Sequence, residues 1–153
     1  MITLTIHTNV IKKIILSAIK ANKGKYSYEE LVIDGLKILD MIRNVGCKIT
    51  ITGKENLKNL KSPCVFIANH MSTLETLVLP GVIGKEFRVT FVVKKSLLKY
   101  PFFGKILSAL NPIPVTRKNP REDYKVVITE GVKRLQEGIS VIVFPQATRE
   151  IIF

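Results

Sequence analysis

The sequence predicts an α/β fold, with a mixed sheet covered by helices and an N-terminal helical segment before it. From about residue 47 onward, short apolar runs of strand length alternate with segments of helical period, which is typical of a sheet covered by helices. The β-branched run 139–144 suits a strand that is buried on both faces. Residues 1–46 carry mainly helical spacing. We therefore expect a helical segment over 1–46 and an α/β core over 47–153.

The first helix is expected from about Val10, because apolar residues follow at positions 10, 11, 14, 15 and 18 with lysines on the opposite face. A Lys-rich amphipathic helix of this kind can lie in a membrane interface, where each basic residue gains about 1 kcal/mol near anionic lipid. An ordinary helix that faces the protein core explains the same pattern equally well. Both interpretations stay open at this point.

A second helix is predicted between a start signal at Ser27 and a stop signal at Gly46. Ser27 and Glu30 form a capping box, apolar residues follow at helical spacing, and Gly46 is suited to end the helix. The next segment, 47–53, alternates apolar and polar residues and predicts a strand. The pattern changes there from helical to strand-like, so the boundary between the two parts is expected near Gly46.

Strands and helices alternate beyond this boundary. Strands are expected at 65–68, 87–93, 113–115 and 139–144, and helices at 74–83, 104–110 and 119–136. Pro80 is expected to bend or end the first of these helices. Asn119 as the N-cap, followed by Pro120 and Glu122, starts the last one. The apolar ending 151–153 resembles the start of another element, so we expect a fragment or a C-terminally truncated protein.

Composition limits the classes of function. The chain has 24 Lys+Arg against 12 Asp+Glu, a net charge of +12, and 46% of its residues are hydrophobic. This apolar content excludes a disordered chain, while the apolar runs are too short for a bilayer span, which needs about 18–20 residues. The basic excess fits an anionic membrane surface, anionic substrates, nucleic acid or plain solubility. Aromatic residues are few and no nucleic-acid-binding motif is recognisable, so we expect no nucleic-acid partner.

Cysteine and histidine are scarce. Cys47 and Cys64 form no CxxC pair, which favours a reducing, cytosolic setting over a disulfide framework. The two histidines, His7 and His70, leave too few ligands for a zinc site of the usual Cys/His kind. We therefore expect no metal site.

His70 is the first candidate for chemistry, because it follows the strand 65–68 directly, at a strand end where α/β sheets usually bind ligands. An imidazole can take up a proton near neutral pH. Glu75 can meet it only from the first turn of the next helix, since five helical residues turn side chains about 140° apart. Glu75 would then hold the tautomer of the imidazole. The alternative is structural: Ser72 and Glu75 have capping-box spacing, so Glu75 can simply cap its own helix.

Two arginines follow other short strands. Arg117 comes just after 113–115 and Arg149 comes after 139–144. Each is explained singly as a solvated surface residue. Together with His70 they could converge on one edge of the sheet, and the planar guanidinium group suits phosphate oxygens.

Four sequence blocks together resemble the glycerolipid acyltransferase family, typified by 1-acyl-glycerol-3-phosphate acyltransferase. Asn69-His70-x-Ser72 with the acid Glu75 looks like the NHxxxxD block of the family, and 144–149 (FPQATR) resembles its FPEGTR block. Between them, 94–104 (KKSLLKYPFFG) and 113–117 (IPVTR) are similar to two further family stretches. The blocks occur in the family order and cover about residues 47–150.

The resemblance implies transfer of an acyl group from a thioester, acyl-CoA or acyl carrier protein, to the hydroxyl of a lysophospholipid such as 1-acyl-glycerol-3-phosphate. No cofactor is implied. His70 would be the general base and Glu75 would orient it. The sequence has no GxSxG elbow, which fits direct attack without a covalent acyl-enzyme. The substrate-binding residues, several of them for the acceptor's phosphate, would be Asn69, Ser72, Arg117, Gln146, Thr148 and Arg149.

The resemblance also implies a membrane-associated enzyme of phospholipid synthesis, at the cytoplasmic face of an anionic membrane surface. The chain departs from the family pattern where Glu75 replaces Asp, Gln146 replaces Glu and Ala147 replaces Gly. The fourth family block is also missing. The alternative function is therefore a catalytically inactive or truncated lipid-binding member of the same fold.

Overall fold

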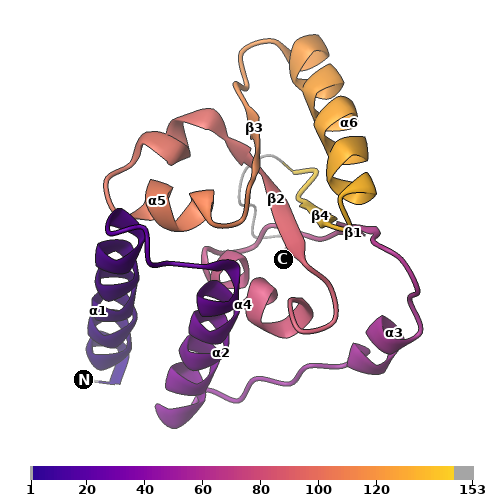
Figure 1. The fold of residues 1–153 in the computed structure, drawn as a ribbon. Coiled ribbons are helices and arrows are strands. Elements are labelled where there is room, and N and C mark those ends of the chain that lie inside the picture. Colours follow the sequence, from indigo (N-terminus) through magenta and orange to yellow (C-terminus); the bar gives the residue numbers. More distant parts are fainter. Residues whose placement is uncertain (1, 147–153) are drawn as a thin grey trace.

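The computed structural model describes residues 2–146, with side chains from Thr8 onward. The helices are α1 (Ile2–Asn22), α2 (Tyr28–Asn44), α3 (Lys54–Lys58), α4 (Leu74–Ile83), the 3-10 helix η1 (Lys95–Lys99), α5 (Phe103–Ser108) and α6 (Pro120–Gln136). The strands are β1 (Val65–Ile67), β2 (Val89–Lys94), β3 (Ile113–Val115) and β4 (Ser140–Val143). Strands and helices alternate from β1 onward (Figure 1), which confirms the α/β class.

The four strands form one sheet in the order β1-β4-β2-β3. Val65 pairs with Val141, Val89 with Ser140, and Val92 with Ile113. All three strand pairs are parallel, so the mixed sheet that we expected is a parallel sheet among residues 2–146. The connections explain this arrangement, because each strand is followed by at least one helix before the next strand begins.

The two faces of the sheet are covered by different helices. Phe91 and Ile142 point to the main hydrophobic cluster, which includes Leu31 of α2 and Ile83 of α4. On the other face α6 packs on β3 and β4. Figure 1 shows α1, α2 and α5 on one side of the strands and α6 on the other. Side chains of β2 and β4 are accordingly buried on both faces, as the β-branched run 139–144 predicted.

The predicted second helix is present as α2. The Ser27 hydroxyl accepts a hydrogen bond from the Glu30 amide, as the capping box predicted. α2 crosses α4 at very short range, because a Cβ at Gly35 would lie 2.9 Å from the amide nitrogen of Gly81. Only glycine permits this approach, and it fixes α2 against the helix that follows β1.

α1 has one face packed on the protein and one apolar face exposed. Ala18 is fully buried, and Lys13 forms an ion pair with the buried Asp34 of α2 at 2.5 Å. The residues exposed by 41–54% are Ile11, Ile15, Leu16 and Ile19. The single apolar face predicted for 10–18 is therefore divided, because Ile14 and Ala18 pack inward while Ile11 and Ile15 do not. In the described part of the chain no helix has the length and apolarity to cross a membrane.

One prediction for a single segment was wrong. Residues 47–53 form no strand, because neither edge of the sheet pairs with them and the segment has no buried face. Pro80 does not end α4, which continues to Ile83 with Pro80 buried; a bend at Pro80 stays a prediction. The boundary near Gly46 stays a prediction, although the main hydrophobic cluster contains residues from both sides of it.

Candidate active site

The carboxyl ends of the parallel strands bring three of the predicted site residues to one edge of the sheet. His70 follows β1, Arg117 follows β3 and Gln146 follows β4. His70 and Arg117 line the same cavity of about 550 Å³, and Gln146 contacts the backbone of His70. Thr148 and Arg149, predicted at the same edge, lie outside the described residues.

His70 and Glu75 are in direct contact. Nδ1 of His70 lies 2.7 Å from Oε1 of Glu75, and both side chains are about four-fifths buried. Burial acts to raise the pKa of Glu75, but hydrogen bonds from the Ser72 hydroxyl, the Ser72 amide and His70 outweigh it and lower the pKa to about 2. Glu75 is therefore a carboxylate that only accepts, so Nδ1 of His70 carries the hydrogen in this contact, and in the neutral ring Nε2 is then the acceptor.

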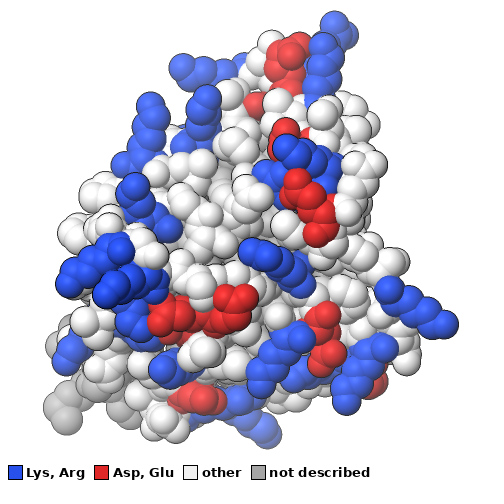
Figure 2. Space-filling view, in the orientation of Figure 1, with Lys and Arg blue, Asp and Glu red and all other residues white. Residues whose placement is uncertain are grey.

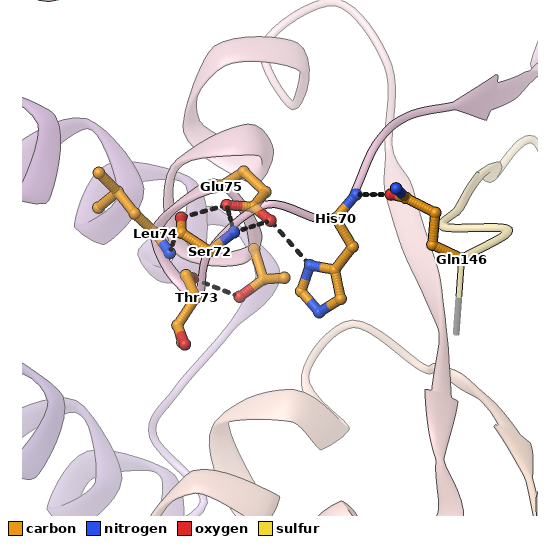
Figure 3. A network of polar contacts seen from close by, with 7 residues as sticks. His70, Ser72, Thr73, Leu74, Glu75 and Gln146 are labelled. Carbon is orange, nitrogen blue, oxygen red and sulfur yellow. Dashed lines mark hydrogen bonds and ion pairs between the residues drawn. The ribbon is translucent and has the colours of Figure 1, made fainter. Parts of the chain in front are cut away.

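Glu75 also accepts hydrogen bonds from Ser72. The Ser72 amide donates to Oε1 at 2.9 Å and to Oε2 at 3.0 Å, and the Ser72 hydroxyl donates to Oε2. Figure 3 shows the carboxylate between Ser72 and the His70 ring, with the second ring nitrogen turned away from Glu75. Glu75 is thus the partner of His70. The capping box predicted for Ser72 and Glu75 is present only in part, because Glu75 accepts from the Ser72 amide but the N-cap residue of α4 is Thr73, with no side-chain cap hydrogen bond. Substrate binding by Ser72 stays a prediction.

Gln146 and Phe144, which both follow β4, also contact His70. The His70 amide donates to Oε1 of Gln146 at 2.6 Å, as Figure 3 shows. The imidazole stacks on the ring of Phe144, with centroids 4.6 Å apart and planes at 26°. Phe144 in turn stacks on Phe91 of β2. The sequence alone did not indicate the contact of Phe144 with His70.

The cavity is lined by both polar or charged and apolar side chains. Its polar or charged lining includes His70, Lys94, Arg117, Asp123 and Tyr124. The apolar lining includes Val93, Leu97, Phe103, Leu107, Val115 and Val127. This size and composition are typical of sites that bind small molecules. Asn69 is exposed next to His70, and its predicted substrate contact stays a prediction.

The loop after β3 shows a residue that the sequence interpretation missed. Asp123 accepts hydrogen bonds from the amides of Thr116 and Arg117, at 2.7 and 2.6 Å. The sequence signal drew attention to its neighbour Glu122, whose amide donates to the N-cap Asn119 as predicted. The sequence could have indicated Asp123 by one signal, a second acidic residue beside Glu122 in the same helical turn.

Metal ligation finds no support among residues 2–146, where no three His, Cys, Asp or Glu side chains are grouped to hold a metal ion. Cys47 and Cys64 are both free thiols.

Comparisons with known proteins identify the family of the chain and relatives of similar sequence and fold. The acyltransferase family model matches residues 48–150. A 1-acyl-sn-glycerol-3-phosphate acyltransferase of Pseudomonas aeruginosa is 36% identical over 104 residues, which are 68% of this chain and 38% of the relative. A chloroplastic enzyme of the same name from Arabidopsis thaliana is 33% identical over 102 residues, 67% of this chain and 28% of the relative. The chain thus spans well under half the length of these relatives.

A solved structure shares the fold. The crystal structure of the 1-acyl-sn-glycerophosphate acyltransferase PlsC from Thermotoga maritima superimposes with a TM-score of 0.68 and 21% sequence identity. The match covers 97% of this chain and 61% of that one. At this identity the likeness concerns the fold alone.

Proposed function

The chain belongs to the acyltransferase family, and from this membership we propose that it is a glycerolipid acyltransferase. The proposed reaction moves a fatty acyl group from acyl-CoA or acyl carrier protein to the hydroxyl of a lysophospholipid such as 1-acyl-glycerol-3-phosphate. The observation that carries this proposal is the contact of His70 with Glu75 at the edge of a 550 Å³ cavity. It leaves one ring nitrogen of His70 as a proton acceptor.

In the proposed reaction His70 is the general base. Nε2 takes the proton of the acceptor hydroxyl while the hydroxyl oxygen attacks the thioester carbonyl carbon. A C–O bond forms, the tetrahedral intermediate collapses with cleavage of the C–S bond, and the leaving thiolate receives the proton from His70. Glu75 stabilises the imidazolium form during the transfer, as carboxylates do in catalytic triads. Such a base contributes about 10²- to 10⁴-fold in rate.

The cavity lining supports the choice of substrate. Lys94 and Arg117 bring positive charge to the same cavity as His70, and guanidinium groups bind phosphate oxygens well. The apolar walls of the cavity suit a fatty acyl chain. Thr148 and Arg149 are proposed as further contacts of the acceptor's phosphate, on the family pattern alone.

The surface supports a membrane location, and its cytoplasmic face is proposed on the family pattern alone. The exposed apolar residues of α1 lie on a helix that also carries Lys12 and Lys20, as helices of membrane interfaces do. Figure 2 shows Lys and Arg side chains scattered over the visible face, with fewer Asp and Glu side chains and areas of other residues between them. The net charge of +12 would attract the protein to anionic lipid.

Product analysis by mass spectrometry tests the proposal. The wild-type chain is incubated with a long-chain acyl-CoA, or the matching acyl carrier protein thioester, and a panel of lysophospholipids with different headgroups. We expect a diacyl product that requires both substrates, with the acid 1-acyl-glycerol-3-phosphate among the preferred acceptors. Lipid binding without any product from either donor would support the inactive lipid-binding alternative instead.

A further inference from the structure

The loop after β3 holds Arg117 in a left-handed backbone conformation. Its φ angle is 60°, a value that residues with a Cβ adopt infrequently. Such conformations persist where surrounding contacts fix them, and they concentrate at functional sites. Arg117 lines the same cavity as His70, so the conformation of its backbone decides where its side chain enters that cavity.

The carboxylate of Asp123 provides the contacts that fix this loop. Oδ1 accepts from the Thr116 amide at 2.7 Å and from the Thr116 hydroxyl at 3.1 Å, while Oδ2 accepts from the Arg117 amide at 2.6 Å. The Lys118 amide donates to the Thr116 hydroxyl at 3.2 Å and closes the turn. The hydrogen bond from the Thr116 amide, helped by those from the Arg117 amide and the Thr116 hydroxyl, lowers the pKa of Asp123 against its partial desolvation.

Consecutive amides that point at one anion form a nest, an arrangement that otherwise binds phosphate or other external anions. Here Asp123, a side chain of the protein itself, occupies the nest formed by Thr116 and Arg117. An anionic ligand in the cavity is therefore not held by these two amides, and the guanidinium of Arg117 is a cationic group of this loop that lines the cavity and can bind it.

We propose that Asp123 is a positioning residue that holds Arg117 in its left-handed conformation and so directs the guanidinium to the anionic group of the acceptor. This inference rests on the proposed function. Asp123 acts through Arg117, so its loss affects binding of the acceptor and not the chemistry at His70.

Steady-state kinetics with separate variation of donor and acceptor test the inference. We expect Asp123→Ala to raise KM for 1-acyl-glycerol-3-phosphate by about tenfold, as loss of hydrogen bonds to a charged group does. We expect kcat and KM for acyl-CoA to stay within about twofold of wild type. Asp123→Asn keeps one acceptor oxygen and should show a smaller increase. Glu122→Gln is the matched control, because Glu122 lies in the same turn and its side chain forms an ion pair with Lys125.

A double-mutant cycle asks whether Asp123 acts through Arg117. In an Arg117→Ala background, the further change Asp123→Ala should alter KM for the acceptor by no more than about twofold. An equal increase in KM for donor and acceptor, a KM unchanged by Asp123→Ala, or full additivity with Arg117→Ala would each overturn the inference.

A backbone measurement separates this inference from the proposed function. The NMR coupling between HN and Hα of Arg117, with its Cα chemical shift, reports φ in the wild type and in Asp123→Ala. We expect the left-handed values to be lost in the variant. If the wild type transfers no acyl group, the proposed function fails but this readout still decides the role of Asp123: left-handed values retained in Asp123→Ala overturn it.

Discussion

Nδ1 of His70 lies 2.7 Å from Oε1 of Glu75, although five helical residues would turn the two side chains about 140° apart. The contact forms because α4 begins at Leu74, which leaves His70 in the loop and Glu75 in the first helical turn. The same carboxylate accepts the amide and hydroxyl of Ser72. The contacts with Ser72 therefore fix the carboxylate, and the carboxylate fixes the tautomer of the imidazole.

The length of the Glu75 side chain matters for this contact. Glu75→Asp restores the residue of the family pattern but withdraws the carboxylate by about one C–C bond, roughly 1.5 Å. Because misplacements of about 1 Å can lower rates by 10²-fold, we expect kcat to fall by about tenfold to 10²-fold, with little change in either KM. Glu86→Gln, a change to an exposed acid outside the cavity lining, is the control. A kcat equal to or above that of wild type would contradict the observed contact.

Acid stability reports on the same carboxylate. The pKa of Glu75 is lowered from 4.5 to about 2, so its ionised form stabilises the folded chain above pH 4.5 and this contribution is lost as the pH falls toward 2. Glu75→Gln lacks the ionised group at every pH. We expect urea unfolding to show a difference in free energy of unfolding between wild type and variant that is largest near pH 7 and shrinks below pH 4.5. A difference that does not change with pH would contradict the lowered pKa.

Oε1 of Gln146 accepts a hydrogen bond from the His70 amide at 2.6 Å. Loss of this acceptor and gain of a negative charge at the same position should therefore have different effects on the kinetics. Gln146→Leu removes the acceptor, and we expect kcat to fall by about tenfold because the loop that carries His70 loses a half-buried hydrogen-bond partner. Gln146→Glu keeps an acceptor but adds negative charge near the proposed phosphate site. It should raise KM for an anionic acceptor and leave kcat closer to wild type. Kinetics of both variants against the same acceptor check this, and the opposite pattern would contradict it.

A vesicle-binding assay tests whether α1 contacts the membrane. Ile15→Ser and Leu16→Ser each remove an exposed apolar side chain from α1, and each buried CH₂ group contributes about 0.8 kcal/mol to membrane binding. We expect each variant to bind anionic phosphatidylglycerol vesicles several-fold more weakly in co-sedimentation. Val132→Ser, at a similarly exposed site on α6, is the matched control. Equal weakening by all three changes would show that α1 is not the contact surface.

Most of the core elements could be predicted because local signals and tertiary structure agree there. β4 has a β-branched sequence buried in the sheet, and α6 begins at the Asn119 cap. Residues 47–53 carry an equally regular alternation, but no strand is available to pair with them. Periodicity reports only on the segment itself, and pairing depends on the rest of the chain.

The residue types of the site and the contact of His70 with Glu75 could be predicted from the sequence, but the contacts between residues of distant elements could not. The strand-end positions of His70 and Arg117 indicated a shared edge, and the cavity contains both. The stacking of Phe144 on His70 and the hold of Asp123 on the Arg117 loop join residues of different elements. No spacing rule along the sequence specifies such contacts, because they depend on how the parallel strands are ordered.

Replacement of His70 tests the central claim most directly. Acceptor-dependent thiol release from a long-chain acyl-CoA is measured for wild type, His70→Ala and His7→Ala, in which the other histidine of the chain is changed. We expect His70→Ala to lower kcat by about 10²- to 10⁴-fold, with the circular dichroism and thermal unfolding of a folded chain, and His7→Ala to stay active. A folded His70→Ala variant that releases thiol at the wild-type rate would contradict the role of His70 as the general base.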